Sequence, residues 1–208
     1  MAEFLDYILS QEYLPSVISS SYGDDEQTVP EAYARRVCQS FAQLGARGVS
    51  FLVSSGDNGV GAPRNCVANT GNNASTFLSI FPASCPYVTS VGATKGFNPE
   101  VAAANPSNAF WSGGGFSNYF PRPTYQDTAV QTYLEGLNGV FDGLYNQSGR
   151  GYPDVSAQVS SFAKASPHSI LTTLPGPRIW HCLERGGNRS RRNECFLSHR
   201  GFDLGPCQ

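Results

Sequence analysis

Residues 48–61 read GVSFLVSSGDNGVG and join an apolar, β-branched run to small residues and one carboxylate. A short apolar run that ends at glycine is typical of a buried strand in a parallel sheet. In open parallel sheets, ligand sites form beyond the carboxyl ends of the strands. The pattern therefore places Asp57 at the lip of a sheet, where its carboxyl group can act on a bound molecule.

The residues before this strand predict the remainder of a βαβ unit. Residues 17–21 read as a short first strand, and the helix after it carries apolar residues at i, i+4, i+8 and i+11. Thr28 and Glu31 fit a Thr-x-x-Glu capping box at the start of that helix. Strand, crossover helix and strand make parallel neighbours. With a third strand at 87–92, this predicts an α/β fold; the helical stripe comprises Tyr33, Val37, Phe41 and Leu44.

Composition excludes several classes of protein. The 208 residues are 40% hydrophobic and 14% charged, which suits one sizeable folded core. The net charge of −2 gives no reason to expect nucleic acid or an anionic membrane as a partner. No apolar run is long enough to cross a bilayer.

Charge divides the chain near Gln158. Residues 1–158 hold seven Lys and Arg against thirteen Asp and Glu, whereas residues 159–208 hold seven against three and contain all three histidines. The second part is rich in Arg, Pro and Gly and lacks periodicity, so we expect a disordered basic tail. A reading-frame slip or a retained intron after Gln158 is one hypothesis for its origin. Its cysteines lack a Cys-x2-Cys pair, so no metal site is expected there.

The cysteines and sequons bear on the compartment. Cys66 and Cys85 bound a long irregular stretch, and they form either a disulfide or two buried free thiols. The sequons at Asn73, Asn146 and Asn188 are compatible with secretion. The acidic first residues do not resemble a signal peptide. We therefore expect an N-terminally incomplete copy of a secreted protein.

Five motifs resemble one family. They are SYGDDE at 21–26, SSGD at 54–57, FPASCPYVTSVG at 81–92, SGGGFSN at 112–118 and GRGYPDV at 149–155. In this order they are similar to the sedolisins, which are serine-carboxyl peptidases, and the resemblance is closest to fungal tripeptidyl peptidases. The resemblance covers residues 1–158 and ends there. It implies an incomplete subtilisin-like parallel sheet with flanking helices.

The resemblance also implies roles for particular residues. The family uses a Ser nucleophile in a Gly-Thr-Ser-Ala-Ser turn, a Glu base oriented by an Asp, and a second Asp that stabilises the oxyanion. Asp57 matches this last residue, which must be protonated to donate a hydrogen bond and so suits acid. A peptide or unfolded protein substrate, in the extracellular space, would pair with the chain after the first strand. The implied substrate-binding residues are Ser21, Tyr22, Gly23, Ser55 and Gly56.

The sequence departs from the family in three respects. Gly-Thr-Ser-Ala-Ser does not occur in the 208 residues, the Glu/Asp pair would precede Met1, and the family's C-terminal calcium site has no counterpart. We therefore expect no cofactor and no turnover by this chain. The alternatives are a peptide-binding remnant without catalysis and a mispredicted gene product.

Three other motifs have plainer interpretations. Asp154 is expected to satisfy local amides, and residues 24–26 supply acids near the start of a helix, where the helix dipole favours them. For residues 112–115 a glycine turn is favoured over a substrate rim.

Overall fold

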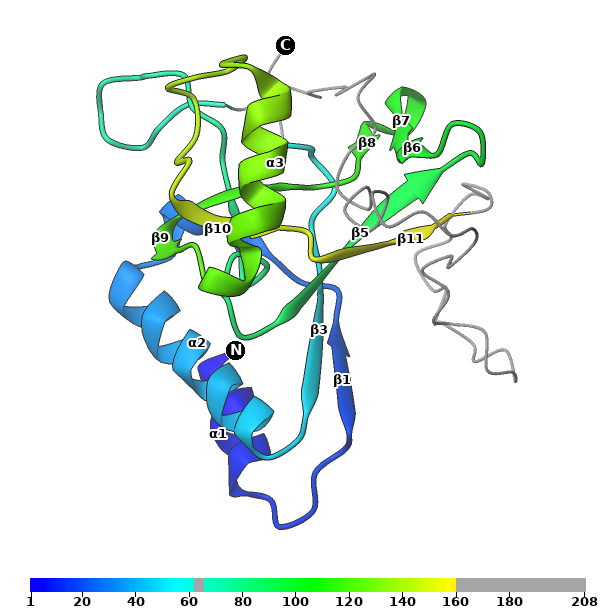
Figure 1. Ribbon diagram of the computed structural model, residues 1–208. Coiled ribbons are helices and arrows are strands. Elements are labelled where there is room, and N and C mark those ends of the chain that lie inside the picture. Colours follow the sequence, from blue (N-terminus) through cyan, green and yellow to red (C-terminus); the bar gives the residue numbers. More distant parts are fainter. Residues whose placement is uncertain (62–65, 160–208) are drawn as a thin grey trace.

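The computed structural model describes residues 1–61 and 66–159 of the chain (Figure 1). The predicted basic tail, with the sequon at Asn188 and the cysteines and histidines of residues 160–208, lies outside this part. No helix among the described residues has the length and apolar character needed to span a membrane.

A parallel sheet forms the centre of the fold, as the sequence predicted. Its four parallel strands lie in the order β1, β3, β5, β11, and a short strand β6 runs antiparallel to the end of β5. Ser20 of β1 lies opposite Val53 of β3, so these two strands end side by side. The strand bounds are β1 Val17–Ser20, β3 Ser50–Ser54, β5 Thr89–Lys95, β6 Val101–Ala102 and β11 Val155–Gln158.

Two helices, α1 (Ala2–Ser10) and α2 (Glu31–Ala46), lie together along β3 and β1 (Figure 1). The predicted stripe on α2 faces the core, where Phe41 packs on Phe51 of β3 with ring centroids 4.5 Å apart. Of the stripe, only Tyr33 at the first turn remains partly exposed. A third helix, α3 (Asp127–Leu137), follows a 3-10 turn, η3 (Thr124–Gln126).

Short antiparallel pairs extend from the sheet and hold the loops at its carboxyl end. Each pair joins segments that are distant in sequence or flank a turn. The pairs are β2 (Asp24–Asp25) with β4 (Ile80–Phe81), β7 (Ala104–Asn105) with β8 (Phe110–Trp111), and β9 (Gly115–Pro121) with β10 (Gly149–Tyr152); a 3-10 turn, η2 (Pro106–Asn108), separates β7 from β8.

The predicted capping box does not form. Thr28 ends a separate 3-10 turn, η1 (Glu26–Thr28), and its hydroxyl donates to the carbonyl of Asp25 at 2.8 Å. Pro30 occupies the N-cap position of α2 and offers no side-chain hydrogen bond. Glu31 instead forms an ion pair with Arg35 at 2.6 Å, one turn along the helix. Because α2 begins at Glu31 with Pro30 as its N-cap, Thr28 and Glu31 do not occupy the N-cap and third positions that a capping box requires.

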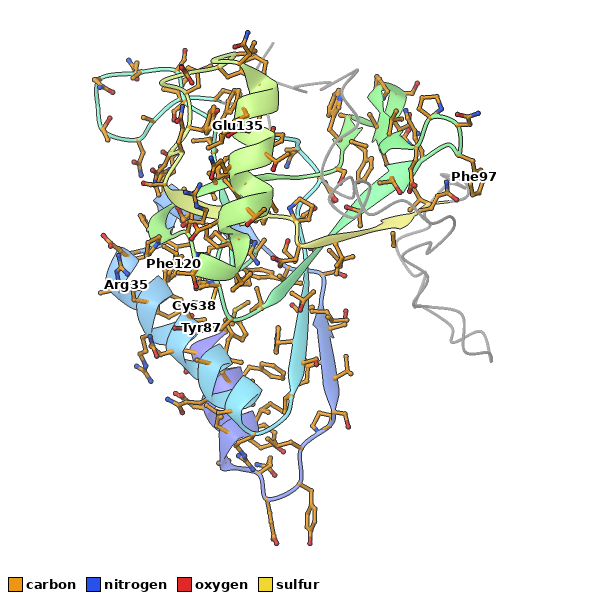
Figure 2. The ribbon with its side chains drawn as sticks, in the orientation of Figure 1. Arg35, Cys38, Tyr87, Phe97, Phe120 and Glu135 are labelled. Atoms are coloured by element: carbon orange, nitrogen blue, oxygen red, sulfur yellow. A yellow bond between two sulfur atoms is a disulfide. The ribbon has the colours of Figure 1, made fainter. Side chains whose placement is uncertain are left out.

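The predicted disulfide between Cys66 and Cys85 is wrong. Cys85 is bonded to Cys38 of α2, with an S–S distance of 1.94 Å and the Cα atoms 5.7 Å apart. Figure 2 shows Cys38 on α2 beside Tyr87, which follows Cys85 by two residues. Cys66 is also disulfide-bonded. The packing of α2 on the segment before β5 determines which cysteines pair. The positions of cysteines at the two ends of a loop, from which the pairing was predicted, carry no information about this packing.

Candidate functional site

Asp57 lies three residues beyond the end of β3, at the carboxyl edge of the sheet, as the sequence predicted. Its side chain is exposed, and within residues 1–61 and 66–159 its carboxylate has no hydrogen bond or ion pair. Nothing in this part of the chain therefore neutralises the group or occupies its oxygen atoms. As far as the described residues are concerned, both oxygen atoms of the Asp57 carboxyl group are available to a ligand.

The backbone around Asp57 is held firmly although the side chain is free. Its carbonyl accepts a hydrogen bond of 2.9 Å from the Trp111 amide, and the Gly56 carbonyl accepts one of 2.8 Å from Gly113. A Cβ atom at Gly113 would lie 2.1 Å from the Ser55 carbonyl oxygen, so only glycine permits this approach. Residues 112–114 form an irregular link between β8 and β9, so the glycine turn favoured from the sequence is not seen, and this link holds the backbone beside Asp57 in place.

The predicted substrate segment lies beside this loop. Ser21, Tyr22 and Gly23 directly follow β1 and are exposed. Among the described strands, β1 is at the edge of the sheet, with β3 on its other side. A strand that ends at a sheet edge leaves backbone groups free to pair with an extended peptide.

The side chain of Ile80 packs against both Gly23, which follows β1, and Gly56, which follows β3. A Cβ atom built on Gly23 would lie 2.5 Å from Cγ2 of Ile80, and one built on Gly56 would lie 3.3 Å from Cγ1 of the same side chain. The buried Tyr152 hydroxyl accepts a hydrogen bond of 2.8 Å from the Ile80 amide. The segment after β1 and the loop after β3 therefore lie on either side of one fixed apolar residue.

Glu26 gave no signal in the sequence as part of the site. It is 1% exposed and belongs to the buried core beneath the site, so it does not serve as a surface acid near a helix. Its carboxylate accepts hydrogen bonds from the Ser79 hydroxyl (2.8 Å), the Ser117 hydroxyl (2.5 Å) and the Asn118 amide (2.7 Å). The sequence did not reveal this burial for two reasons. Both serines are far from Glu26 in sequence, and the two acids directly before Glu26 suggested an exposed acidic segment.

The carboxyl group of Asp25 has a raised pKa. Burial, and secondly the charge of Asp24, raise the pKa of the Asp25 carboxyl group above its usual value of 3.8. Its backbone pairs with Ile80, directly below the candidate site. The local environment therefore favours the protonated form of an acid at this position.

Asp154 has a structural role, as the sequence predicted, but the partners of its carboxylate are not local amides. Its carboxylate accepts a hydrogen bond of 2.7 Å from the Ser90 amide and forms an ion pair of 2.5 Å with Arg150, whose side chain is completely buried. Gln126 donates a further hydrogen bond of 3.3 Å. These contacts join β10, β5 and η3 and leave Asp154 no part in binding a substrate at Asp57.

Two other features of the described residues offer no better site. A hollow of about 560 Å³ lies at the opposite end of the sheet, where β3 and β5 begin, between Tyr87 and Tyr125. Asp154 lines this hollow, but none of the predicted catalytic or substrate-binding residues does. In the described part of the chain, no three His, Cys, Asp or Glu residues gather where they could hold a metal ion.

Comparison with known proteins agrees with the geometry. No family model matches the chain. It is 51% identical over 170 residues to "Probable tripeptidyl-peptidase SED3" of Trichophyton verrucosum, covering 81% of this chain and 27% of that protein. It is 50% identical over 155 residues to "Tripeptidyl-peptidase SED2" of Arthroderma otae, covering 74% and 25%. The chain thus spans about a quarter of the length of these relatives.

A solved structure extends the match to the fold. Pseudomonas sedolisin, a serine-carboxyl proteinase complexed with two molecules of pseudo-iodotyrostatin, superposes with a TM-score of 0.50 at 25% identity. The match covers 73% of this chain and 40% of that one. The parallel sheet, the sequence relatives and this solved structure together show that the chain belongs to the sedolisin family of serine-carboxyl peptidases.

Proposed function

We propose that this chain supplies the oxyanion-stabilising acid and a peptide-binding edge of an acid-acting serine-carboxyl peptidase. The observation that carries the proposal is the exposed carboxyl group of Asp57, held at the end of β3 beside the edge segment of residues 21–23. The relatives named tripeptidyl-peptidases indicate the reaction class, and a peptide or unfolded protein is the proposed substrate.

The chemistry assigned to Asp57 follows from its charge states. A tetrahedral intermediate of peptide hydrolysis carries a negative charge on the former carbonyl oxygen, and a hydrogen-bond donor stabilises it. Ionised Asp57 would repel that oxygen, whereas protonated Asp57 can donate to it. The proposed reaction therefore requires acid, in agreement with an acidic extracellular setting. Immobilising the loop through Trp111 and Gly113 keeps the donor in place before the charge develops.

Binding of the peptide is assigned to the sheet edge. Ser21, Tyr22 and Gly23 would pair with the backbone of an extended substrate, and Gly56 would form the opposite side near Asp57. Ser55, which the sequence also predicted to bind substrate, is only 2% exposed and so is left to support the loop of Asp57. Because Gly-Thr-Ser-Ala-Ser is absent from the 208 residues, we propose that this polypeptide alone binds peptides without cleaving them.

Binding and cleavage can be tested separately. Fluorescence anisotropy with labelled tri- to hexapeptides between pH 3.5 and pH 7 should detect binding by the purified 208-residue chain, and mass spectrometry should find no cleavage. Tyr22→Ala should weaken binding at least several-fold. Glu12→Gln, which changes an exposed acid before β1, is the matched control and should bind normally. Absence of binding at every pH would refute the binding assignment, and acid-dependent cleavage would refute the proposed lack of turnover.

A further inference from the structure

Two of the three sequons lie in the described part of the chain, and their environments differ sharply. Asn73 is exposed at the tip of a hairpin-like loop, with a left-handed φ of 51°. Its side-chain amide has no hydrogen bond with the described residues. Asn146 is partly buried, and both ends of its amide are engaged.

The loop of Asn73 presents its tip to solvent because its base is fixed. Val67 and Ser75 form an antiparallel bridge across the base of the loop. The side chain of Gln27 donates a hydrogen bond of 3.1 Å to the Val67 carbonyl and accepts one of 2.9 Å from the Asn69 amide. A large group attached at Asn73 would extend into solvent without disturbing these contacts.

Asn146 cannot carry such a group in this fold. Its amide nitrogen donates a hydrogen bond of 2.9 Å to the carbonyl of Ser117, a residue without solvent exposure. That carbonyl is packed so closely on Gly149 that a Cβ there would lie 2.0 Å from its oxygen. The hydroxyl of Ser148, the third sequon residue, donates back to the Asn146 amide oxygen at 2.8 Å. The space that a sugar would need is filled by backbone.

We infer that Asn73 is the N-glycosylation site of the described part of this chain and that Asn146 stays unmodified in the folded protein. The inference rests on the secretory setting of the proposed function. The ligand class is an oligosaccharide delivered on a lipid diphosphate by the transferase of the secretory pathway. The Asn73 side-chain nitrogen forms a bond to C1 of the first sugar and loses a proton, while the bond from C1 to the diphosphate oxygen breaks and the lipid diphosphate leaves.

The test uses the full chain with a cleavable leader, produced in a yeast secretory host in an Asn188→Gln background. Peptide N-glycosidase in H₂¹⁸O converts each occupied Asn to a labelled Asp, and mass spectrometry of secreted and cell-retained protein locates the label. We expect label at Asn73 and none at Asn146. Asn73→Gln and Ser75→Ala should each abolish the glycan, and both proteins should keep the parent melting temperature.

Asn146→Gln is the matched comparison. It should keep the glycan at Asn73 and melt at a lower temperature, because it removes the hydrogen bond to Ser117. Label at Asn146 in folded protein, or no label at Asn73 in either fraction, would overturn the inference. Peptide binding is measured on unglycosylated protein from bacteria. If that protein binds no peptide, the proposed function is contradicted, whereas the glycosylation inference is decided only by the label found at Asn73 and Asn146.

Discussion

The hydroxyl of Ser117 donates a hydrogen bond of 2.5 Å to the carboxylate of Glu26 across 91 residues of sequence. This bond joins β9 to the turn η1, and the hydroxyl of Ser79, which directly precedes β4, donates to the same carboxylate. A buried carboxylate is tolerated when neutral donors satisfy its oxygens. The network therefore fixes the base on which the candidate site rests.

Replacing Glu26 tests this network. Glu26→Gln turns an acceptor oxygen into a donor that faces hydroxyl and amide donors, and we expect a loss of about 3 kcal/mol in the free energy of unfolding. Ser117→Ala should lose about 1–2 kcal/mol. The control Glu31→Gln removes only an exposed ion pair and should change stability by less than about 1 kcal/mol. Urea denaturation measures all three, and equal effects of Glu26→Gln and Glu31→Gln would contradict the network's importance.

The Cys38–Cys85 disulfide closes a loop with a sequence separation of 47 residues. In the chain-entropy model such a bond stabilises the fold by about 4 kcal/mol, so the double variant Cys38→Ala/Cys85→Ala should lose about that amount in denaturant titrations. Peptide mapping without reduction checks the pairing directly. Trypsin must be combined with chymotrypsin, because no Lys or Arg lies between Cys66 and Cys85. A peptide linking these two cysteines would disprove the pairing described above.

Asp25 should make the fold more stable in acid. Its pKa is raised in the folded state, so the folded chain holds the proton more tightly than the unfolded chain does. Its contribution to stability is therefore present below the ordinary value of 3.8 and is lost as pH rises through the raised folded pKa. As pH rises through this window, the melting temperature of Asp25→Asn should increase relative to that of the parent, because only the parent acquires a charge at this position. A difference that does not change with pH would show that Asp25 has no such effect.

Two glycine substitutions should act in opposite directions. Gly113→Ala forces a Cβ onto the Ser55 carbonyl and should cost about 3 kcal/mol, displacing the loop of Asp57. Gly45 lies at an exposed position of α2, and no atom lies within 4 Å of the place that a Cβ would occupy. Gly45→Ala should therefore stabilise the fold by about 0.5–1 kcal/mol. Thermal melting of both variants gives the comparison, and a neutral Gly113→Ala would contradict the close approach.

The sequence alone determined the βαβ unit, the third parallel strand and the place of Asp57 beyond β3. These features depend on residue periodicity and on the position of glycine after an apolar run, which are local properties of the chain. The motifs around Gly23 and Asp57 likewise carried the family resemblance, because their residues are contiguous.

Tertiary structure decided the partners of Cys85, Thr28 and Glu26. Cys85 meets Cys38 because α2 packs on the segment before β5, and Thr28 bonds within its own 3-10 turn because α2 begins only at Glu31. Glu26 accepts hydrogen bonds in the interior from Ser79 and Ser117, which come from separate segments of the chain. The partners of Cys85 and Glu26 come from segments that are far apart in sequence, and the partner of Thr28 depends on the residue at which α2 begins. A local sequence pattern does not specify either of these.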